Sequence, residues 1–178
     1  MRPESSHADS ISATESVLGF DFGAWRVGIA VGERLIGTGK PLTTLHNANA
    51  EQIDWEAVLT IIKQWQPQTL IVGWPVDDQG DCYPIAAAIR RFAARLHEKT
   101  ALPVWLVDER LTSEQARLRV GAKSAQNDPQ QIDAMAAAII IDHYFAAYEA
   151  SKVTEISKQS VKASIARHLQ RMGHLAQD

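Results

Sequence analysis

The stretch VLGFDFGAWRVGIAVG, residues 17–32, decides the fold because it reads as two strands joined by a tight turn. Residues 17–22 form an apolar run that contains one acid, Asp21, and residues 27–31 form a second apolar run. A third, weaker strand is expected over residues 35–42, where glycines interrupt the apolar pattern. Short connections between successive strands favour an antiparallel meander over a strand–helix–strand unit at this point of the chain.

After this meander, helical and strand patterns alternate along the chain. Helices are predicted from apolar spacing or from a helix-start signal, over residues 51–66, 84–99, 112–121 and 129–150. Strands are predicted over the β-rich runs at residues 69–73 and 104–107. Because strands separated by helices are usually parallel, we expect an α/β fold in which three antiparallel strands are followed by parallel strands that helices cover.

The composition favours one globular domain in a reducing compartment. The chain has 178 residues, of which 46% are hydrophobic and 22% charged, and this suits one domain with a sizeable core. Cys82 is the only cysteine, so no intramolecular disulfide can form and a cysteine zinc site is not expected. Since no apolar run approaches the ~20 residues that span a bilayer, we expect a cytoplasmic protein without membrane contact.

Both ends of the chain are expected to lie outside the core. Residues 1–16 are polar and rich in serine, which predicts a disordered tail before a domain over residues 17–150. Residues 151–178 carry five basic and two acidic side chains, against 13 and 19 in the rest of the chain. This basic tail could form a marginal amphipathic helix, and its charge could serve a polyanionic partner or simply keep a surface solvated.

Three acidic side chains stand out because of where they lie in these patterns. Asp21 interrupts a buried strand, where a lone charge costs on the order of several kcal/mol. Glu109 follows an apolar strand, at the carboxyl end where ligand sites of α/β sheets gather. Asp133 lies near the start of the last helix, on the side expected to face the sheet. Since hard divalent cations prefer carboxylate oxygens, the three acids predict a Mg²⁺ or Mn²⁺ site suited to phosphodiester hydrolysis.

Each acid also has a simpler interpretation. Asp21 could cap the turn that follows it, Glu109 could pair with Arg110 or Arg26, and Asp133 could merely favour the positive end of a helix dipole. The segment DFGAWRVGIAV is also similar to the phosphate-binding hairpin of actin-like ATPases, but those enzymes need two related domains and this chain has room for one. The joint occurrence of the three acids favours the metal site.

Four segments occur in an order and at a spacing that are typical of a known family. They are DFGAWRVGIAVG (residues 21–32), IVGWP (71–75), DERLTS (108–113) and ID-A with the Ala/Ile run after it (132–141). Together they resemble the YqgF family, bacterial Holliday junction resolvase-like proteins that are also assigned to maturation of the small-subunit ribosomal RNA precursor. DERLTS is the most specific of the four segments, and the match covers roughly residues 17–148.

The resemblance implies an RNase H-like fold, a five-stranded mixed sheet flanked by helices. It also implies catalytic acids on the first strand, a later strand and the last core helix. In this chain those positions fall on Asp21, Glu109 and Asp133, which would also hold Mg²⁺ or Mn²⁺. The residues expected to bind substrate or support the site are Arg26, Arg110, Thr112, Gly23 and Gly73.

The chain also departs from the family pattern at several positions around the expected site. Ala24 and Trp25 stand where a Thr-Lys pair is common, which removes a hydroxyl and a cation. Trp25 could stack on a base or simply pack on the surface. Asp77 stands where an Asn is common, and Gln130 and Gln131 stand where basic residues are common. These differences bear on substrate affinity more than on the triad.

The sequence therefore predicts a metal-dependent endonuclease that hydrolyses phosphodiester bonds in maturation of the 16S ribosomal RNA precursor. A Holliday junction resolvase for DNA recombination and repair is the first alternative, and it would need two active sites in a symmetric dimer. A non-catalytic nucleic-acid-binding adaptor is the second alternative. The expected partner is precursor ribosomal RNA or branched DNA, bound by a monomer or a weak homodimer.

Overall fold

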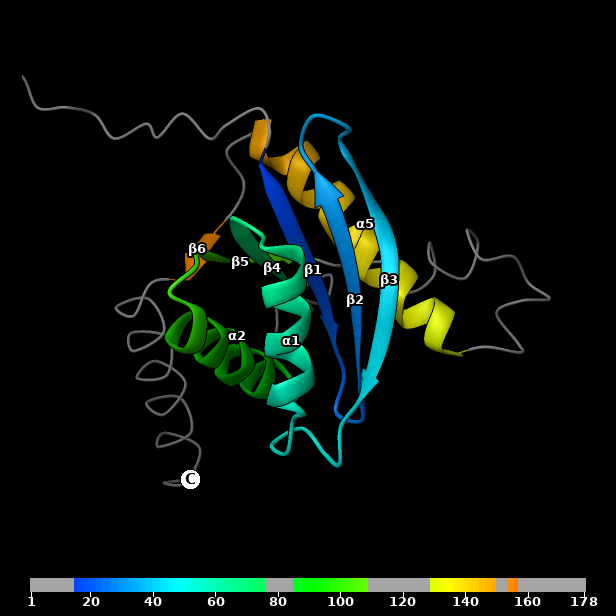
Figure 1. Cartoon of the computed structure of the whole chain (residues 1–178), viewed down its shortest axis with the longest axis vertical. Helices are drawn as coiled ribbons and strands as arrows, with labels where there is room; N and C mark the ends of the chain where they lie inside the picture. Colours follow the sequence, from blue (N-terminus) through cyan, green and yellow to red (C-terminus); the bar gives the residue numbers. More distant parts are fainter. Residues whose placement is uncertain (1–14, 76–84, 109–128, 150–153, 157–178) are drawn as a thin grey trace, which may run out of the picture.

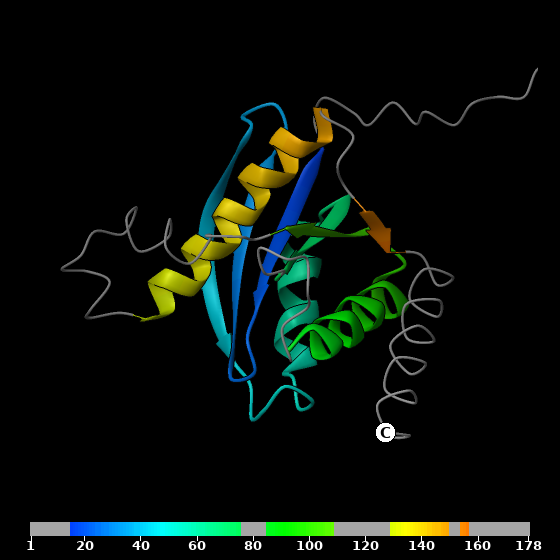
Figure 2. The ribbon, with the colours of Figure 1, turned by 180° about the vertical axis from the view of Figure 1, so that it is seen from behind.

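The computed structural model describes residues 15–75, 85–108, 129–149 and 154–156, and these form one mixed sheet with helices on both faces (Figure 1). The strand order is β3-β2-β1-β4-β5-β6. Helix α5 crosses one face of the sheet, and α1 and α2 cover the other face, as the two opposite views show (Figures 1 and 2). No helix among the described residues is long and apolar enough to cross a membrane.

The strands confirm the predicted sequence of three antiparallel strands followed by parallel ones. They are β1 (Ser16–Phe22), β2 (Arg26–Glu33), β3 (Thr38–His46), β4 (Thr69–Trp74), β5 (Val104–Asp108) and β6 (Thr154–Ile156). β1 pairs antiparallel with β2, and β2 with β3, whereas β4 pairs parallel with both β1 and β5. The three described helices are α1 (Trp55–Trp65), α2 (Ala86–Thr100) and α5 (Pro129–Glu149).

The structure corrects several predicted boundaries. β3 runs from Thr38 to His46 rather than over residues 35–42, because Leu35 and Ile36 lie in a turn that Gly37 closes at a φ of 75°. α1 begins at Trp55 rather than at residue 51, since the Asp54 carboxylate accepts a hydrogen bond from the Ala57 N–H and caps the helix there. The helix predicted over residues 112–121 lies outside the described residues.

The sheet gains a sixth strand at its far edge. Thr154–Ile156 belong to the segment for which an amphipathic helix was considered, but they pair antiparallel with β5 as β6. A three-residue strand carries almost no periodic signal of its own, because its stability comes from the hydrogen bonds of the neighbouring strand. The five-stranded core sheet predicted from the sequence is thus extended by one short strand.

The two faces of the sheet bury separate apolar cores. On the face of α1 and α2, the rings of Phe20, Phe22 and Trp55 surround Phe92 at centroid distances of 5.6, 4.7 and 5.4 Å. On the face of α5, the helix packs Ile140, Ile141 and Tyr144 against Val17, Ala30 and the strands β4 and β5. Alternate residues of β1 therefore point into different cores, as the two-residue period of a strand requires.

Helix α5 lies unusually close to the sheet because glycines of β1, β2 and β3 face it. A Cβ atom added to Gly28 would lie 2.0 Å from the carbonyl oxygen of Asp133, and one added to Gly39 would lie 2.3 Å from that of Ala138. The same approach occurs at Gly19, whose Cβ would lie 2.9 Å from the carbonyl oxygen of Ala137. Because the helix presents alanines at this interface, its backbone lies almost in contact with the backbones of the strands.

We expect Gly28→Ala to destabilise the fold by about 2–3 kcal/mol, because the new methyl would overlap helix backbone that cannot rotate away. Gly32→Ala is the matched control and should cost less, since the closest atoms would belong to side chains, Cγ2 of Ile141 at 2.6 Å and Cε2 of Phe145 at 3.2 Å, while the nearest backbone atom beyond its chain neighbours would lie 3.3 Å away. Urea unfolding followed by circular dichroism measures both free energies. Equal losses in the two variants would contradict the close backbone contact.

Candidate active site

Asp21 and Asp133 come together because a glycine lets their two elements touch. Asp21 lies near the end of β1 and pairs with Gly28 of β2. Gly28 in turn lies under the backbone of Asp133, near the start of α5. Both predicted carboxylates therefore lie on the α5 face of the sheet, at the end where β1 turns into β2.

Arg26 supplies the positive charge closest to this pair among the described contacts. Its Nε donates a hydrogen bond to Oδ2 of Asp133 at 2.5 Å, with the two side chains 42% and 20% exposed. The backbone of Arg26 is held by the turn, since its carbonyl oxygen accepts a hydrogen bond from the Gly23 N–H at 2.8 Å. Among the described residues Arg26 pairs with Asp133, whereas Glu109, its other possible partner, lies outside them.

The environment of Asp21 disfavours its charge. Burial, followed by repulsion from the Asp133 carboxylate, raises the pKa of Asp21 from 3.8 to about 7, although Arg26 acts in the opposite direction. A carboxyl group with such a pKa is partly protonated near neutral pH. Among the described side chains, two carboxylates face one cation and are under-compensated, which is the condition that a bound divalent cation relieves.

The described residues fit part of a metal site. Asp21 and Asp133 offer carboxylate oxygens, which hard divalent cations prefer. Within residues 15–75, 85–108, 129–149 and 154–156, no group of three or more His, Cys, Asp or Glu side chains could hold a metal ion. Glu109, the third predicted ligand, lies outside these residues.

The described end of β5 shows from which point of the sheet the chain continues to Glu109. β5 ends at Asp108, which pairs with Trp74 at the end of β4. Because β1, β4 and β5 are parallel, their carboxyl ends lie at the same end of the sheet. Glu109 follows Asp108 directly in the sequence. The chain therefore leaves β5 at the same end of the sheet at which Asp21 lies.

The other predicted site residues divide into described and undescribed ones. Gly23 forms the turn that positions Arg26, and Gly73 is a buried residue of β4 that pairs with Val107. Arg110 and Thr112 lie outside the described residues, as does Asp77. Trp25 projects from the turn between β1 and β2 with 66% of its surface exposed.

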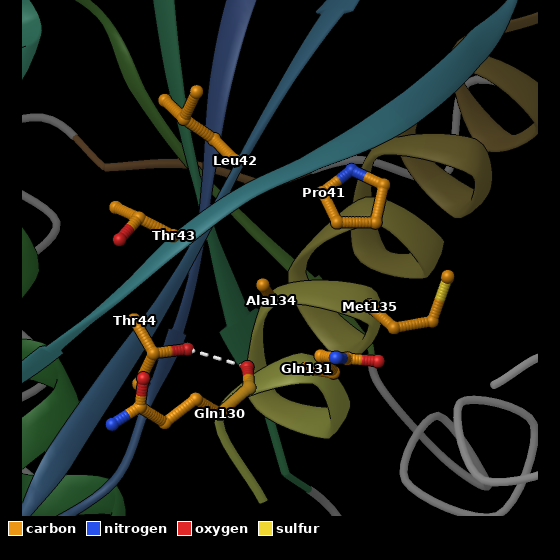
Figure 3. Close-up of a pocket in the computed structure, with 8 residues that line it drawn as sticks. All are labelled: Pro41, Leu42, Thr43, Thr44, Gln130, Gln131, Ala134 and Met135. Carbon is orange, nitrogen blue, oxygen red and sulfur yellow. Dashed lines mark hydrogen bonds between the residues drawn. The ribbon is translucent and has the colours of Figure 1, made fainter. Parts of the chain in front are cut away.

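A groove between β3 and α5 was not anticipated from the sequence. It has a volume of about 330 Å³ and is lined by Pro41, Leu42, Thr43, Thr44, Gln130, Gln131, Ala134 and Met135 (Figure 3). The Thr44 hydroxyl donates a hydrogen bond to the Gln130 carbonyl oxygen at 2.7 Å, and the Gln130 amide lies 2.9 Å from the His46 ring. On the helix, the lining residue Ala134 directly follows Asp133 in the sequence. Thr43 and Thr44 were the available signal, but they lie beyond residue 42, where the predicted strand ends.

A buried acid at the opposite end of β1 was also missed. Glu15 is 3% exposed and accepts a hydrogen bond from the Thr69 hydroxyl. The Tyr144 hydroxyl donates to the same carboxylate at 3.4 Å, and Nη1 of Arg34 lies 3.9 Å from its other oxygen. These contacts tie β1, β4 and α5 together, so Glu15 has a structural role.

Sequence relatives carry names that refer to ribosomal RNA. A protein of Alcanivorax borkumensis described as "Putative pre-16S rRNA nuclease" is 39% identical over 130 residues, which cover 73% of this chain and 95% of the relative. A Legionella pneumophila protein with the same description is 44% identical over 131 residues, or 71% of this chain and 92% of the relative.

A solved structure shares the fold. RuvC of T. thermophilus, in complex with a Holliday junction substrate, matches with a TM-score of 0.51 at 15% identity, over 80% of this chain and 99% of that chain. This likeness confirms the RNase H-like fold that the sequence resemblance implied.

The family assignment follows from a family model as well as from these relatives. The model described as "RuvX: Holliday junction resolvase" matches residues 15–147, which include β1, the two carboxylates and most of α5. With two relatives at 39% and 44% identity over more than two thirds of the chain, the chain belongs to the RuvX family of Holliday junction resolvase-like nucleases, hydrolases that act on ester bonds.

Proposed function

We propose that this protein is a metal-dependent endonuclease that cleaves the precursor of 16S ribosomal RNA. The observation that carries the proposal is the under-compensated pair of carboxylates, Asp21 and Asp133, which the raised pKa of Asp21 reflects. The descriptions of the relatives at 39% and 44% identity support the substrate. The family description and the RuvC likeness support a four-way DNA junction as the second candidate substrate.

In this proposal, Asp21, Asp133 and Glu109 hold Mg²⁺ or Mn²⁺. The bound cation would lower the pKa of an attacking water and neutralise charge on the leaving oxygen. The three side chains come from β1, from α5 and from the position after β5, so they would approach one phosphate from different directions. The proposal also includes Glu109 as a metal ligand, and Arg110 and Thr112 as residues that bind substrate or support the site.

Arg26 has two partners in the proposed cycle. Without substrate it hydrogen-bonds Asp133 and so screens the repulsion between the two carboxylates. Its side chain is 42% exposed, so it can reach a ligand without unfolding the turn that holds its backbone. We therefore assign Arg26 to orienting a non-bridging phosphate oxygen when substrate is present, because guanidinium groups bind phosphate in a fixed geometry.

Asp21→Asn and Asp133→Asn should each reduce cleavage of a precursor 16S RNA fragment at least about 100-fold in Mg²⁺ or Mn²⁺, because each removes a charged oxygen ligand. EDTA should abolish cleavage by the unchanged protein. A four-way DNA junction is assayed in parallel, and its cleavage in place of RNA would select the second candidate. Equal activity of the two variants and the unchanged chain would refute the proposed site.

The pKa of Asp21 predicts an unusual pH dependence of stability in the absence of metal. Because folding raises this pKa from 3.8 to about 7, the contribution of the protonated group is complete below about pH 4 and is lost as pH rises through 7. Asp21→Asn removes the titration. The difference between its melting temperature in EDTA and that of the unchanged chain should therefore increase in favour of the variant from pH 5 to pH 8.

Asp54→Asn is the matched control for this measurement, because Asp54 is an exposed helix cap and Asn caps a helix equally well. The melting curve of this variant should follow the unchanged chain over the same pH range. If Asp21→Asn also follows it, the carboxyl group is not under-compensated in the folded protein.

A further inference from the structure

Trp25 exposes an aromatic ring in the turn that leads to Arg26. It is 66% exposed at the turn between β1 and β2. The other exposed large hydrophobic side chains of the described residues lie elsewhere, with Leu35 and Ile36 in the β2–β3 turn and Trp65 at the end of α1. Single exposed hydrophobic residues are common on protein surfaces. A role for Trp25 therefore depends on its position in the fold and not on its exposure alone.

The backbone under this ring is fixed by two hydrogen bonds. The Gly23 N–H donates to the Arg26 carbonyl oxygen at 2.8 Å, which closes the turn. The Asn47 N–H donates to the Trp25 carbonyl oxygen at 2.9 Å, which ties the turn to the residue after β3. A tryptophan on a fixed backbone has only two side-chain torsions to order, so little conformational entropy is lost when a ligand packs on it.

Trp25 is also a sequence neighbour of a residue in the proposed reaction centre. Trp25 precedes Arg26, whose Nε bonds Asp133 at 2.5 Å, and neighbouring Cα atoms are about 3.8 Å apart. A nucleotide whose phosphate lies at the carboxylates would therefore have a base within reach of the indole. Aromatic rings stack on any base whose face is free, regardless of its sequence.

The surroundings of Trp25 favour a nucleic acid over an apolar protein surface. Its described neighbours in the turn and in the adjacent strand end are small, polar or basic: Gly23, Ala24, Arg26, His46 and Asn47. A protein hot spot would place the ring at the centre of a larger apolar patch. An aromatic ring next to an arginine is instead the combination that binds a base together with its phosphate.

We propose that Trp25 stacks on an unpaired nucleobase next to the phosphodiester bond that is cleaved. The substrate would then be single-stranded, or have an unpaired base, at the cleavage position, because bases within a duplex stack on one another and expose no face. This inference rests on the proposed nuclease function and adds the conformation of its substrate. The proposed ligand is the base, which RNA and DNA both carry. The experiment therefore compares the two nucleic acids.

The test is equilibrium binding, followed by fluorescence anisotropy in EDTA so that no cleavage occurs. The probes are a labelled 12-nucleotide RNA, the DNA of the same sequence, and a blunt RNA duplex of that sequence. Trp25→Ala should weaken binding of a single-stranded probe roughly tenfold, as expected for the loss of one stacked base. Duplex binding should change less than twofold. Loss with both single strands, or with RNA alone, supports the proposal and shows whether the sugar contributes.

Two variants serve as controls. Trp25→Phe should retain most of the affinity, because it keeps an aromatic face. Trp65→Ala should leave all three affinities unchanged, since Trp65 is an exposed tryptophan at the end of α1, on the other face of the sheet (Figure 1). The proposal is overturned if Trp25→Ala affects duplex and single strands equally, affects neither, or changes the oligomeric state in size-exclusion chromatography.

The binding result is independent of catalysis. If the unchanged protein cleaves no nucleic acid in Mg²⁺ or Mn²⁺, the proposed function fails, while the selective loss with Trp25→Ala can still be observed in EDTA. If cleavage occurs and the loss is not selective, only the stacking proposal fails.

Discussion

The close approach of α5 to the glycines of β1, β2 and β3 is the constraint on which the site depends. At Gly28 the strand backbone lies so near the carbonyl oxygen of Asp133 that a single Cβ atom would overlap it. Glycine inside a strand costs roughly 0.5–1 kcal/mol relative to alanine. Here that cost is offset by the burial of a helix face rich in alanine and isoleucine. The packing thereby fixes where the first turns of α5 lie over the sheet.

The same packing creates an electrostatic problem at the end of β1. It brings Asp133 close enough to Asp21 for the two charges to repel one another, in a position that burial already makes unfavourable for Asp21. Arg26 is bonded to Asp133 and compensates part of this charge. Since the pKa of Asp21 remains raised to about 7, the compensation is incomplete without a proton or a cation. Close packing and the unfavourable charge of Asp21 are therefore consequences of one arrangement.

The sequence was sufficient where the signal is local. Asp21 was recognised because one acid breaks an apolar strand, and the start of α5 because Pro129 suits the first turn of a helix. Features formed between distant segments were not recognised. The bond between Arg26 and Asp133 joins positions 107 residues apart, and the groove beside β3 depends on the same packing. No local pattern specifies which basic residue meets which acid across the sheet.

Strand β1 shows why an acid in an apolar strand is by itself ambiguous. Glu15 directly precedes β1 and is buried, and Asp21 lies near the other end of this strand and is partly buried. Oε1 of Glu15 accepts hydrogen bonds from the hydroxyls of Thr69 and Tyr144, and the Arg34 guanidinium lies 3.9 Å from Oε2, so this carboxylate has neutral donors and a cation as its neighbours. Asp21 instead has a second carboxylate beside it, and its pKa is raised by burial first and by repulsion from that carboxylate second. The neighbours of each acid, and not its place in the strand, therefore separate the acid that joins elements from the one suited to bind a cation.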